Sequence, residues 1–372
     1  MNRALTGQRT AIQHVIWMAR KEHIVKIYCC CGDIGTRILR GKEAQKVWDR
    51  IRFRDGGCWT NYSEGLVRRG CATGDLAWIR HIDEELEEMN RGKVGRPYRY
   101  PDSMVEYARR RHAKDGTDYR TLEGELREIM GLVGRHAISY SQMFKRCRKL
   151  DMLGAAVAEK DPVWVRLANT ANTAAAGGKG ITAAIDVTGM KVAVRGEWMR
   201  EKWKVRRGWV KVHALVDVST GKVLSYCVTT EETVDSKMMF ALVDDAVSRG
   251  HALERVYLDG AYDHRKIWNG MKERGIEMIV SIRKNASTSS LGCPQRAAAV
   301  RVRNRIGNRL WKLVHRYGLR WRVECVFSDL KRVMGETLSA KSFPAMAREI
   351  DQKIALHNNF KDVIAGAMTG RN

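Results

Sequence analysis

The chain has 372 residues, 44% of them hydrophobic, so it is long enough for two or three domains and too apolar for wholesale disorder. Its 67 Lys and Arg against 42 Asp and Glu leave a net charge of +25, and no apolar run reaches the roughly 18 residues that span a bilayer. A surface this basic repels itself unless a polyanion neutralises it, so nucleic acid is the expected partner and a membrane is not.

The first 56 residues are predicted to form a mainly helical, basic segment. Ala11, Val15, Met18 and Ala19 recur at the spacing of one helix face. Basic residues lie among the apolar ones of the first 20 positions, and no small-residue cleavage site follows, which argues against a signal peptide. The segment has no motif with a recognisable chemistry, so its role is left open.

The nine cysteines do not have the spacing of a secreted disulfide framework, since they are odd in number and three are consecutive. Reduced thiols in a cytoplasm are therefore expected. A zinc site is the alternative, although its cysteines lack the C-x2-C pairs that such sites usually have. The candidate ligands are Cys29, Cys31, Cys58 and Cys71.

Residues 57–170 are predicted to form a helical DNA-binding region with a candidate helix-turn-helix at 119–150. Thr117 or Asp118 can cap its first helix, and Ser139 can cap the second. A plain helical hairpin is the alternative interpretation. The second helix carries Lys145, Arg146, Arg148 and Lys149. The basic, Gly- and Pro-broken stretch at 91–99 predicts an exposed arm.

A Gly-rich linker is predicted at 171–180, and the pattern then changes to alternating strands and helices over 181–362. Strands are expected at 183–187, 211–218, 222–229, 255–258 and 277–282, helices at 236–249, 263–274, 317–334 and 344–360, and a tail at 363–372. Two early antiparallel strands followed by helix–strand alternation predict an α/β fold, a mixed sheet with helices on both faces. This order is compatible with the ribonuclease H-like fold.

Three acidic residues occupy positions that are unusual for carboxylates of an ordinary solvent-exposed surface. Asp186 interrupts an apolar strand, Asp259 follows a strand and precedes a glycine, and Glu324 lies on a helix among arginines. Each alone is compatible with a salt bridge or a strand-end cap. Together they offer the oxygen ligands that Mg²⁺ prefers, in the number that two ions require.

The helix around Glu324 has the most specific pattern. Tyr317, Arg320, Glu324 and Lys331 are separated by three, four and seven residues, which predicts that they share one helix face. An adjacent apolar stripe can dock the helix on the sheet. A metal ligand flanked by two cations and a phenol suits a phosphodiester, whereas the alternative is a surface ion pair between Arg320 and Glu324.

This spacing, Tyr317-x2-Arg320-x3-Glu324-x6-Lys331, resembles the Y-R-E-K signature of DDE transposases from bacterial and archaeal insertion sequences, in the branch called family five. The resemblance extends to the segments AIDVTGMKV and VYLDGAYD, which are similar to the family's two aspartate blocks, and to the run Arg283-Lys284-Asn285-Ala286. It covers roughly residues 57–360 in the family's order, while residues 1–56 match nothing in it.

The resemblance implies a prokaryotic transposase with an RNase H-like core that cleaves and rejoins DNA at terminal inverted repeats. It implies that Asp186, Asp259 and Glu324 bind two Mg²⁺ or Mn²⁺ ions and catalyse the reaction, while Tyr317, Arg320 and Lys331 contact DNA. A homodimer on the DNA ends and a nucleoid-associated location in the cytoplasm are further implications.

The basic stretch before Glu324 agrees with this expectation. Between Ser281 and Arg322 there are eleven Arg or Lys and no Asp or Glu, which predicts a DNA-binding surface that includes Arg283 and Lys284. Four other aspartates are rival carboxylates near the proposed site: Asp217, Asp235, Asp244 and Asp263. Capping or hairpin roles are expected of Asp217 and Asp235, and a supporting position beside the metal site is their alternative. His213 and His357 are expected to be structural, because two-metal chemistry does not need a histidine.

Two alternatives belong to other functional classes. A non-catalytic DNA-binding regulator would keep the basic surface without needing the acids. A domesticated metal-dependent nuclease would share the three acids without recognising paired ends. Inverted repeats bordering the reading frame favour the transposase over both.

Overall fold

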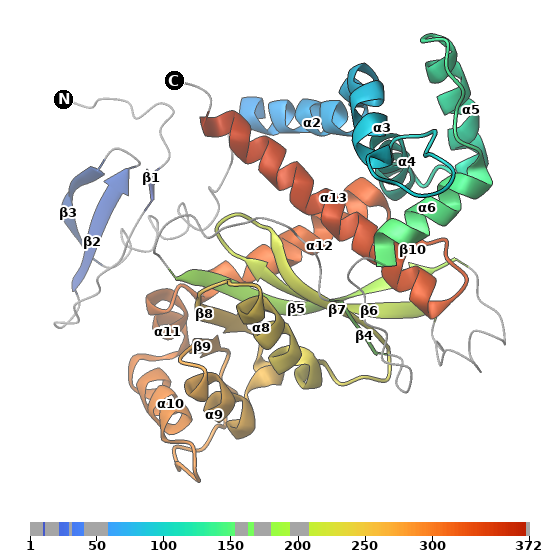
Figure 1. The fold of residues 1–372 in the computed structure, drawn as a ribbon. Coiled ribbons are helices and arrows are strands. Elements are labelled where there is room, and N and C mark those ends of the chain that lie inside the picture. Colours follow the sequence, from blue (N-terminus) through green and yellow to red (C-terminus); the bar gives the residue numbers. More distant parts are fainter. Residues whose placement is uncertain are drawn as a thin grey trace, which may run out of the picture. The chain divides into compact units, whose positions relative to one another are not determined.

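A computed structural model describes residues 10–11, 22–29, 32–40, 59–152, 163–166, 180–193 and 208–369 (Figure 1). The chain divides into two compact units, which we describe separately. One comprises residues 1–65 and 301–318, and the other comprises residues 66–300 and 319–372. Among the described residues, no helix combines the length and apolarity needed to cross a membrane.

The first unit contains a three-stranded antiparallel sheet, and the predicted helical character of residues 1–56 is wrong for its strands. The strands are β1 (Thr10–Ala11), β2 (Glu22–Cys29) and β3 (Gly32–Arg40). Their sequences explain the outcome, because β-branched residues such as Ile24, Val25 and Ile27 favour strands, and short apolar runs do not distinguish the two structures. The rest of the helical pattern, at 12–21, lies outside the described residues.

A helical region precedes the sheet, as the sequence predicts, and from Leu66 onward it belongs to the second unit. Its helices are α2 (Trp59–Thr73), the 3-10 turn η1 (Ala77–His81), α3 (Ile82–Asn90), α4 (Asp102–Asp115), α5 (Tyr119–Gly131) and α6 (Tyr140–Met152). The last three helices share a buried core that includes Met104, Leu122, Leu126 and Met143. A three-helix core rather than a bare hairpin therefore holds the candidate helix-turn-helix.

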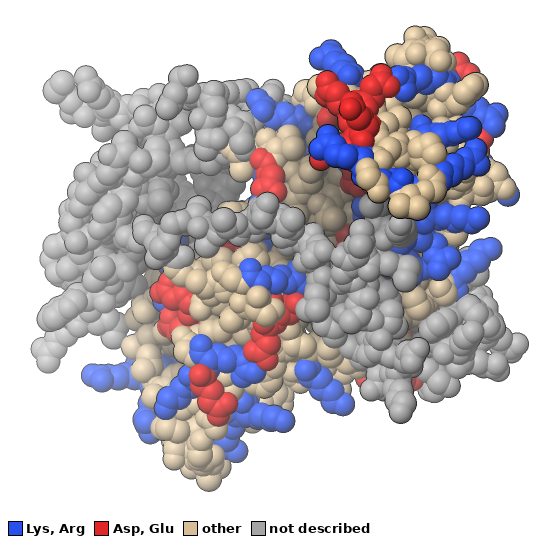
Figure 2. All heavy atoms as spheres, viewed as in Figure 1, with Lys and Arg blue, Asp and Glu red and all other residues tan. Residues whose placement is uncertain are grey.

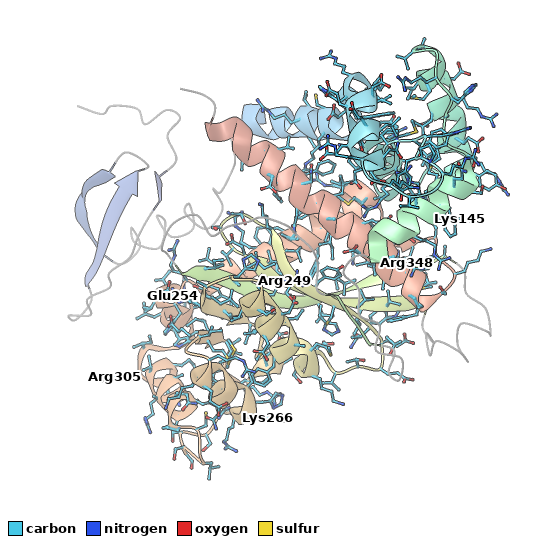
Figure 3. The ribbon with its side chains drawn as sticks, in the orientation of Figure 1. Lys145, Arg249, Glu254, Lys266, Arg305 and Arg348 are labelled. Atoms are coloured by element: carbon cyan, nitrogen blue, oxygen red, sulfur yellow. The ribbon has the colours of Figure 1, made fainter. Side chains whose placement is uncertain are left out.

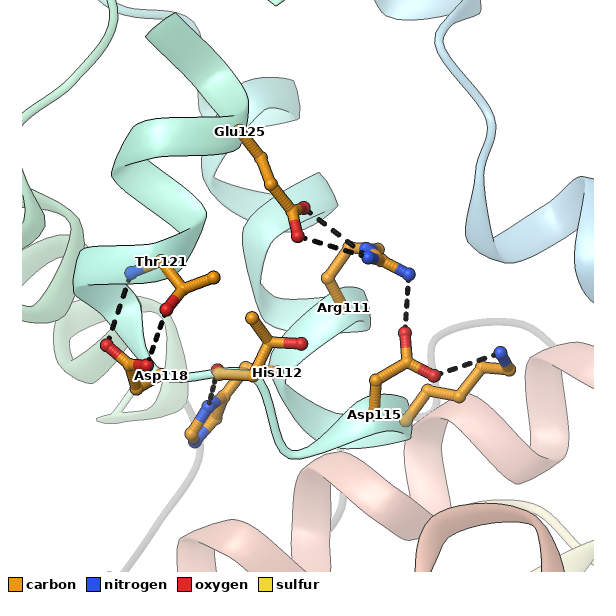
Figure 4. A network of polar contacts seen from close by, with 8 residues as sticks. Arg111, His112, Asp115, Asp118, Thr121 and Glu125 are labelled. Carbon is orange, nitrogen blue, oxygen red and sulfur yellow. Dashed lines mark hydrogen bonds and ion pairs between the residues drawn. The ribbon is translucent and has the colours of Figure 1, made fainter. Parts of the chain in front are cut away.

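Polar contacts fix the ends of these helices (Figure 4). Asp118 accepts the backbone N–H of Arg120 and of Thr121, at 2.9 and 3.2 Å, which confirms it as the cap of α5. Arg111 of α4 pairs with Asp115 at 2.5 Å and with Glu125 of α5 at 3.3 Å. These charged residues thus stabilise the helices that carry them.

A seven-stranded mixed sheet forms the centre of the second unit, in the order β4-β7-β6-β5-β8-β9 with β10 beside β5. Its strands are β4 (Val163–Arg166), β5 (Ile181–Val192), β6 (Trp209–Asp217), β7 (Val223–Thr230), β8 (Leu253–Leu258), β9 (Glu277–Val280) and β10 (Thr337–Leu338). The neighbouring pairs β4–β7, β7–β6 and β6–β5 are antiparallel, whereas the pairs β5–β8 and β8–β9 are parallel. The predicted α/β fold with a mixed sheet is confirmed, and its strand order is compatible with the expected RNase H-like core.

Helices cover both faces of this sheet (Figure 1). Cys227 of β7 belongs to a core that includes residues of α8 (Met239–Ser248) and α9 (Arg265–Glu273). The next residue back, Tyr226, points to the opposite face, where its hydroxyl donates to Asp351 of α13 (Phe343–Thr369). Helix α12 (Trp321–Met334) packs on β5 and β6.

Several predicted boundaries need correction. β4 lies inside the range predicted as helical, 57–170, because its alternating Val163-Trp164-Val165 suits a strand. The expected helix at 317–334 is a 3-10 turn, η4 (Tyr317–Arg320), followed by α12. The expected tail at 363–372 is helical to Thr369, because its residues include good helix formers. Residues 171–179 of the expected linker lie outside the described part.

The basic stretch after β9 forms helices that the sequence analysis did not predict. They are α10 (Pro294–Ile306) and α11 (Asn308–Val314). Arginines and alanines dominate α10, so its apolar periodicity is weak, although Ala297 and Val300 are buried.

Candidate active site

The two aspartates occupy equivalent positions on neighbouring parallel strands. Ala184 of β5 pairs with Tyr257 of β8, and the same register, continued by two residues, places Asp186 beside Asp259. Asp259 follows the last residue of β8, where its carboxylate accepts the N–H of Ala261 at 2.7 Å. Both acids therefore lie toward the carboxyl ends of central strands, where sites on open sheets occur.

The glycine after Asp259 permits a close approach of the chain. A Cβ on Gly260 would lie 3.1 Å from the carbonyl oxygen of Ser281, just beyond β9. A larger residue would require the two segments to shift by a few tenths of an ångström. The sequence Asp259-Gly260 therefore reflects the packing of β8 against the segment after β9.

Glu324 reaches the same region from α12, through Arg320. The Arg320 guanidinium lies 2.9 Å from Oδ2 of Asp186 and also forms an ion pair with Glu324. The apolar side chains Val323, Phe327 and Leu330 are buried and hold α12 on the sheet. One arginine thus joins two acids that are far apart in the sequence.

The electrostatics of Asp186 show that negative charge gathers here. Burial raises the pKa of the Asp186 carboxyl above its usual value, and the nearby Asp259 and Glu324 carboxylates raise it further. The Val187 N–H and the Arg320 guanidinium act in the opposite direction but do not cancel the increase. Burial and the neighbouring carboxylates thus outweigh the effect of Arg320 on this carboxyl.

A cleft of about 700 Å³ opens between β5 and α12. It is lined by Asp186, Val187, Thr188, Glu324, Phe327, Ser328, Lys331, Arg332 and Glu336. Of the predicted site residues, Asp186, Glu324 and Lys331 lie in this cleft, and Arg320 bridges the first two.

The three acids suit a divalent cation by their chemistry, although their side chains are not arranged as a finished site. In the described part of the chain, no three His, Cys, Asp or Glu side chains are grouped so that they could hold a metal ion. Asp259 has no ion-pair partner among the described residues, and Asp186 and Glu324 share one guanidinium. Carboxylate oxygens in excess over local cations are what Mg²⁺ or Mn²⁺ would neutralise.

Other predicted DNA contacts have different surroundings. Tyr317 lies in η4, outside the α-helix that carries Glu324, and its ring contacts Trp311 and Lys312. The single helix face predicted for the four signature residues is therefore wrong at Tyr317. Arg283 and Lys284 are exposed just after β9.

The four other aspartates have structural partners. Asp217 accepts from Ser219 and Thr220 in the β6–β7 turn, and Asp235 pairs with Lys211. Asp244 pairs with Arg274, and Asp263 pairs with Arg296. The contacts of Asp217 agree with the hairpin role expected of it, whereas the other three form ion pairs.

The two histidines are buried away from this cleft. Nε2 of His213 lies 2.8 Å from Oγ1 of Thr229, and Nε2 of His357 lies 3.0 Å from the carbonyl oxygen of Gly221. Burial lowers the pKa of each imidazole to about 4. Nδ1 of His213 has no partner in the described part of the chain.

The zinc alternative gains no support from the described cysteines. Cys71 is an exposed free thiol in α2, Cys29 lies in β2, and Cys31 and Cys58 fall outside the described residues. Cys227, Cys293 and Cys325 are also free thiols, as expected for a protein without a disulfide framework.

The sequence analysis missed the hydroxyl-bearing and outer residues of the cleft. Thr188 stands two residues after Asp186, and Ser328 stands four residues after Glu324. Both spacings put a side chain on the same face as the acid, so the strand and helix periods contained the signal. Arg332 and Glu336 complete the lining but follow no such rule.

Comparison with known proteins adds a family match. Residues 177–359 match the sequence model of the family described as Transposase DDE domain. Solved structures resemble the chain only distantly. A piggyBac transposase synaptic complex with hairpin DNA is 10% identical, with a TM-score of 0.32, and the match covers 52% of this chain and 49% of that one. The chain thus matches about half the length of that transposase.

A Mos1 strand transfer complex is 11% identical, with a TM-score of 0.22, and the match covers 75% of this chain and 82% of that one. A Mos1 transposase paired-end complex is 12% identical, with a TM-score of 0.21, covering 64% and 81%. Likenesses this distant carry no argument about function.

Proposed function

We propose, from the match of residues 177–359 to the family described as Transposase DDE domain, that the protein is an insertion-sequence transposase that cleaves DNA at terminal inverted repeats and transfers the strands to a target. One observation carries the proposal. Asp186 and Glu324 share a single guanidinium in an open cleft, and the sheet register sets Asp259 beside Asp186.

Asp186, Asp259 and Glu324 are proposed to hold two Mg²⁺ or Mn²⁺ ions. When bound, such ions activate a nucleophile and stabilise the charge of a phosphodiester undergoing displacement. The residues of the chain orient the substrate. Arg320 holds Asp186 and Glu324 in place, and Lys331, in the same cleft, provides a cation for the DNA backbone.

The helical region is proposed to recognise the DNA ends. Lys145 of α6 is exposed (Figure 3) and has no polar partner among the described residues. Arg148 is exposed beside the Phe144 ring. Arg146, by contrast, donates to the Tyr100 carbonyl at 2.5 Å and pairs with Asp102, so we assign it to the structure of the region. Basic side chains also gather near α6 in Figure 2, whereas acidic ones gather over α3.

The exposed arm at 91–99 is a second proposed DNA contact. The Asn90 amide donates to the Tyr98 carbonyl, and the Tyr98 N–H donates back to the Asn90 side chain. This reciprocal pair closes the arm into a loop that contains no acidic residue. A loop fixed at its base presents its basic residues at little further entropic cost.

A protein that pairs two ends needs two copies, so we propose a homodimer on DNA, acting at the nucleoid of a prokaryotic cytoplasm. A metal-dependent nuclease is the second candidate, because the same acids would serve it. The two differ in the joining step, which only a transposase performs.

The test uses labelled duplex DNA from both borders of the reading frame, with Mg²⁺ or Mn²⁺. We expect wild-type protein to cut at the repeat ends and to join them to a second DNA. Asp259→Asn should bind the same DNA but not cut it, and Asp244→Asn, an acid outside the cleft, should behave like wild type. Cutting without joining would favour the nuclease, and binding with no cutting by wild-type protein would favour a regulator.

A further inference from the structure

The cleft between β5 and α12 has two walls that run in the same direction. At one end, Arg320 joins Asp186 of β5 to Glu324 near the start of α12. At the other end, Lys191 of β5 pairs with Glu336 just past α12, and its N–H donates to the Glu336 carbonyl at 2.9 Å. Strand and helix therefore stay side by side along the whole cleft.

This alignment sets Thr188 opposite Ser328, one step beyond the two acids. From Asp186 to Thr188 is two strand residues, a rise of about 6.6 Å. From Glu324 to Ser328 is four helix residues, a rise of about 6 Å on the same helix face. The distance from acid to hydroxyl residue is therefore nearly the same along the strand and along the helix, and both residues line the cleft.

The two hydroxyls have no structural task that explains them. In the part of the chain that the structure describes, neither side chain has a hydrogen-bond partner, although Thr188 is half-buried and Ser328 is exposed. On β7, by contrast, Ser225 donates to Asp245 and Thr229 lies within hydrogen-bond distance of His213. A hydroxyl on each wall, both facing open space, can donate to the same oxygen atoms of a ligand.

The chemistry along the cleft changes in an ordered way. Two acids come first, two hydroxyls follow, and the cations Lys331 and Arg332 come next. One step of about 6 Å is close to the spacing of consecutive phosphates on an extended DNA strand. Neutral donors suit a phosphate that lies next to a metal-bound one, because they bind its oxygens without adding charge beside the acids.

We propose that Thr188 and Ser328 form a binding subsite for the phosphodiester adjacent to the reacting one, so that the DNA strand runs from the acids toward Lys331. The inference rests on the proposed function and adds to it the path and direction of the strand. The two residues bind the substrate and take no part in bond breaking.

The test combines protein and DNA changes. Thr188→Val keeps the shape of the side chain and removes its hydroxyl. Duplexes carry one uncharged methylphosphonate each, moved position by position along the strand on both sides of the cleavage point. We expect Thr188→Val to slow cleavage of unmodified DNA roughly tenfold, as loss of one hydrogen bond to a charged group does.

One methylphosphonate position should slow wild-type cleavage by a similar factor, and at that position Thr188→Val should add no further loss. Such non-additivity identifies a direct contact. Ser328→Ala should show the same pattern at the same phosphate. A second readout needs no divalent metal, because the same methylphosphonate should weaken DNA binding by wild-type protein but not by Thr188→Val.

Thr182→Val is the matched control, since Thr182 lies on β5, on the same face, but not in the cleft. It should cut like wild type and keep the full methylphosphonate effect. Wild-type protein that cuts no border DNA would overturn the proposed function and this inference together. If wild type cuts and the losses multiply at every position, or Thr188→Val cuts like wild type, the inference alone is overturned.

Discussion

The helical region and the cleft between β5 and α12 differ in how their charged residues are paired. In the helical region, Arg111 is shared by Asp115 and Glu125, and Arg146 is held by Asp102. In the cleft, Asp186 and Glu324 depend on one guanidinium. In the helical region, charged residues neutralise one another and stabilise the fold. In the cleft, negative charge remains that a bound cation would neutralise.

Acidic residues that are close in the sequence can differ completely in their contacts. Asp259 and Asp263 are only four residues apart in the sequence. The side chain of Asp263 is nevertheless completely buried and accepts two hydrogen bonds from Arg296, at 2.7 and 2.8 Å. Asp259 has only a backbone donor among the described contacts. We therefore expect substitutions at the two residues to affect different properties.

The largest effect is expected at Asp186. Asp186→Asn should reduce strand cleavage at least about a thousandfold, because a carboxylate ligand is lost. Stability should stay equal or rise, because burial raises the Asp186 pKa and the variant no longer buries a charge, while Arg320 keeps Glu324. Cleavage assays and urea unfolding on the same preparations measure both. A clear loss of stability would instead show that Asp186 is structural.

The second effect concerns Asp263. Asp263→Asn should lower the free energy of unfolding by about 3 kcal/mol, because Arg296 then remains buried without a charged partner. Asp244→Asn, in an exposed pair with Arg274, is the matched control and should cost less than about 1 kcal/mol. Equal losses in urea unfolding would contradict the distinction between buried and exposed pairs.

The third effect depends on pH through the buried histidines. The folded pKa of His357 is lowered to about 4, so below the unfolded value of about 6.5 the unfolded chain binds more protons and stability falls. Between pH 7 and pH 5 the loss should be about 2 kcal/mol for this histidine. His357→Gln, which can still donate to Gly221, should lose correspondingly less over that range. An unchanged pH slope would show that His357 does not carry the effect.

Much of the catalytic sheet could be predicted because its strands are apolar and regularly spaced. Asp186 could be singled out since a carboxylate in an apolar strand is costly without a function. The bridging role of Arg320 could not, because it depends on how α12 docks on β5. Periodicity also cannot show which charges on a helix are already paired, and so Arg146 was grouped with Lys145.

The amino-terminal strands illustrate a second limit. Residues 22–29 contain a short apolar run whose length suits a strand or a buried helix equally, and pairing with β1 and β3 decides the outcome. Helix α10 is the opposite case. It has too few apolar residues for a clear helical periodicity, although its arginines and alanines favour a helix. Tertiary contacts settle such segments.

The smallest effect compares a paired cation of the helical region with one that has no polar partner among the described residues. Lys145→Ala removes an exposed charge without a polar partner, so stability should not change, while affinity for DNA falls a few-fold and the log–log salt slope becomes shallower by about 0.9. Arg111→Met removes a charge that Asp115 and Glu125 already neutralise, so DNA affinity and slope should stay the same and stability should fall by less than about 1 kcal/mol. Gel shifts of both full-length variants across a salt range, with border and scrambled DNA, measure the slopes. The reverse pattern, with Arg111 altering the slope and Lys145 leaving it unchanged, would show that pairing within the fold does not decide which cations bind DNA.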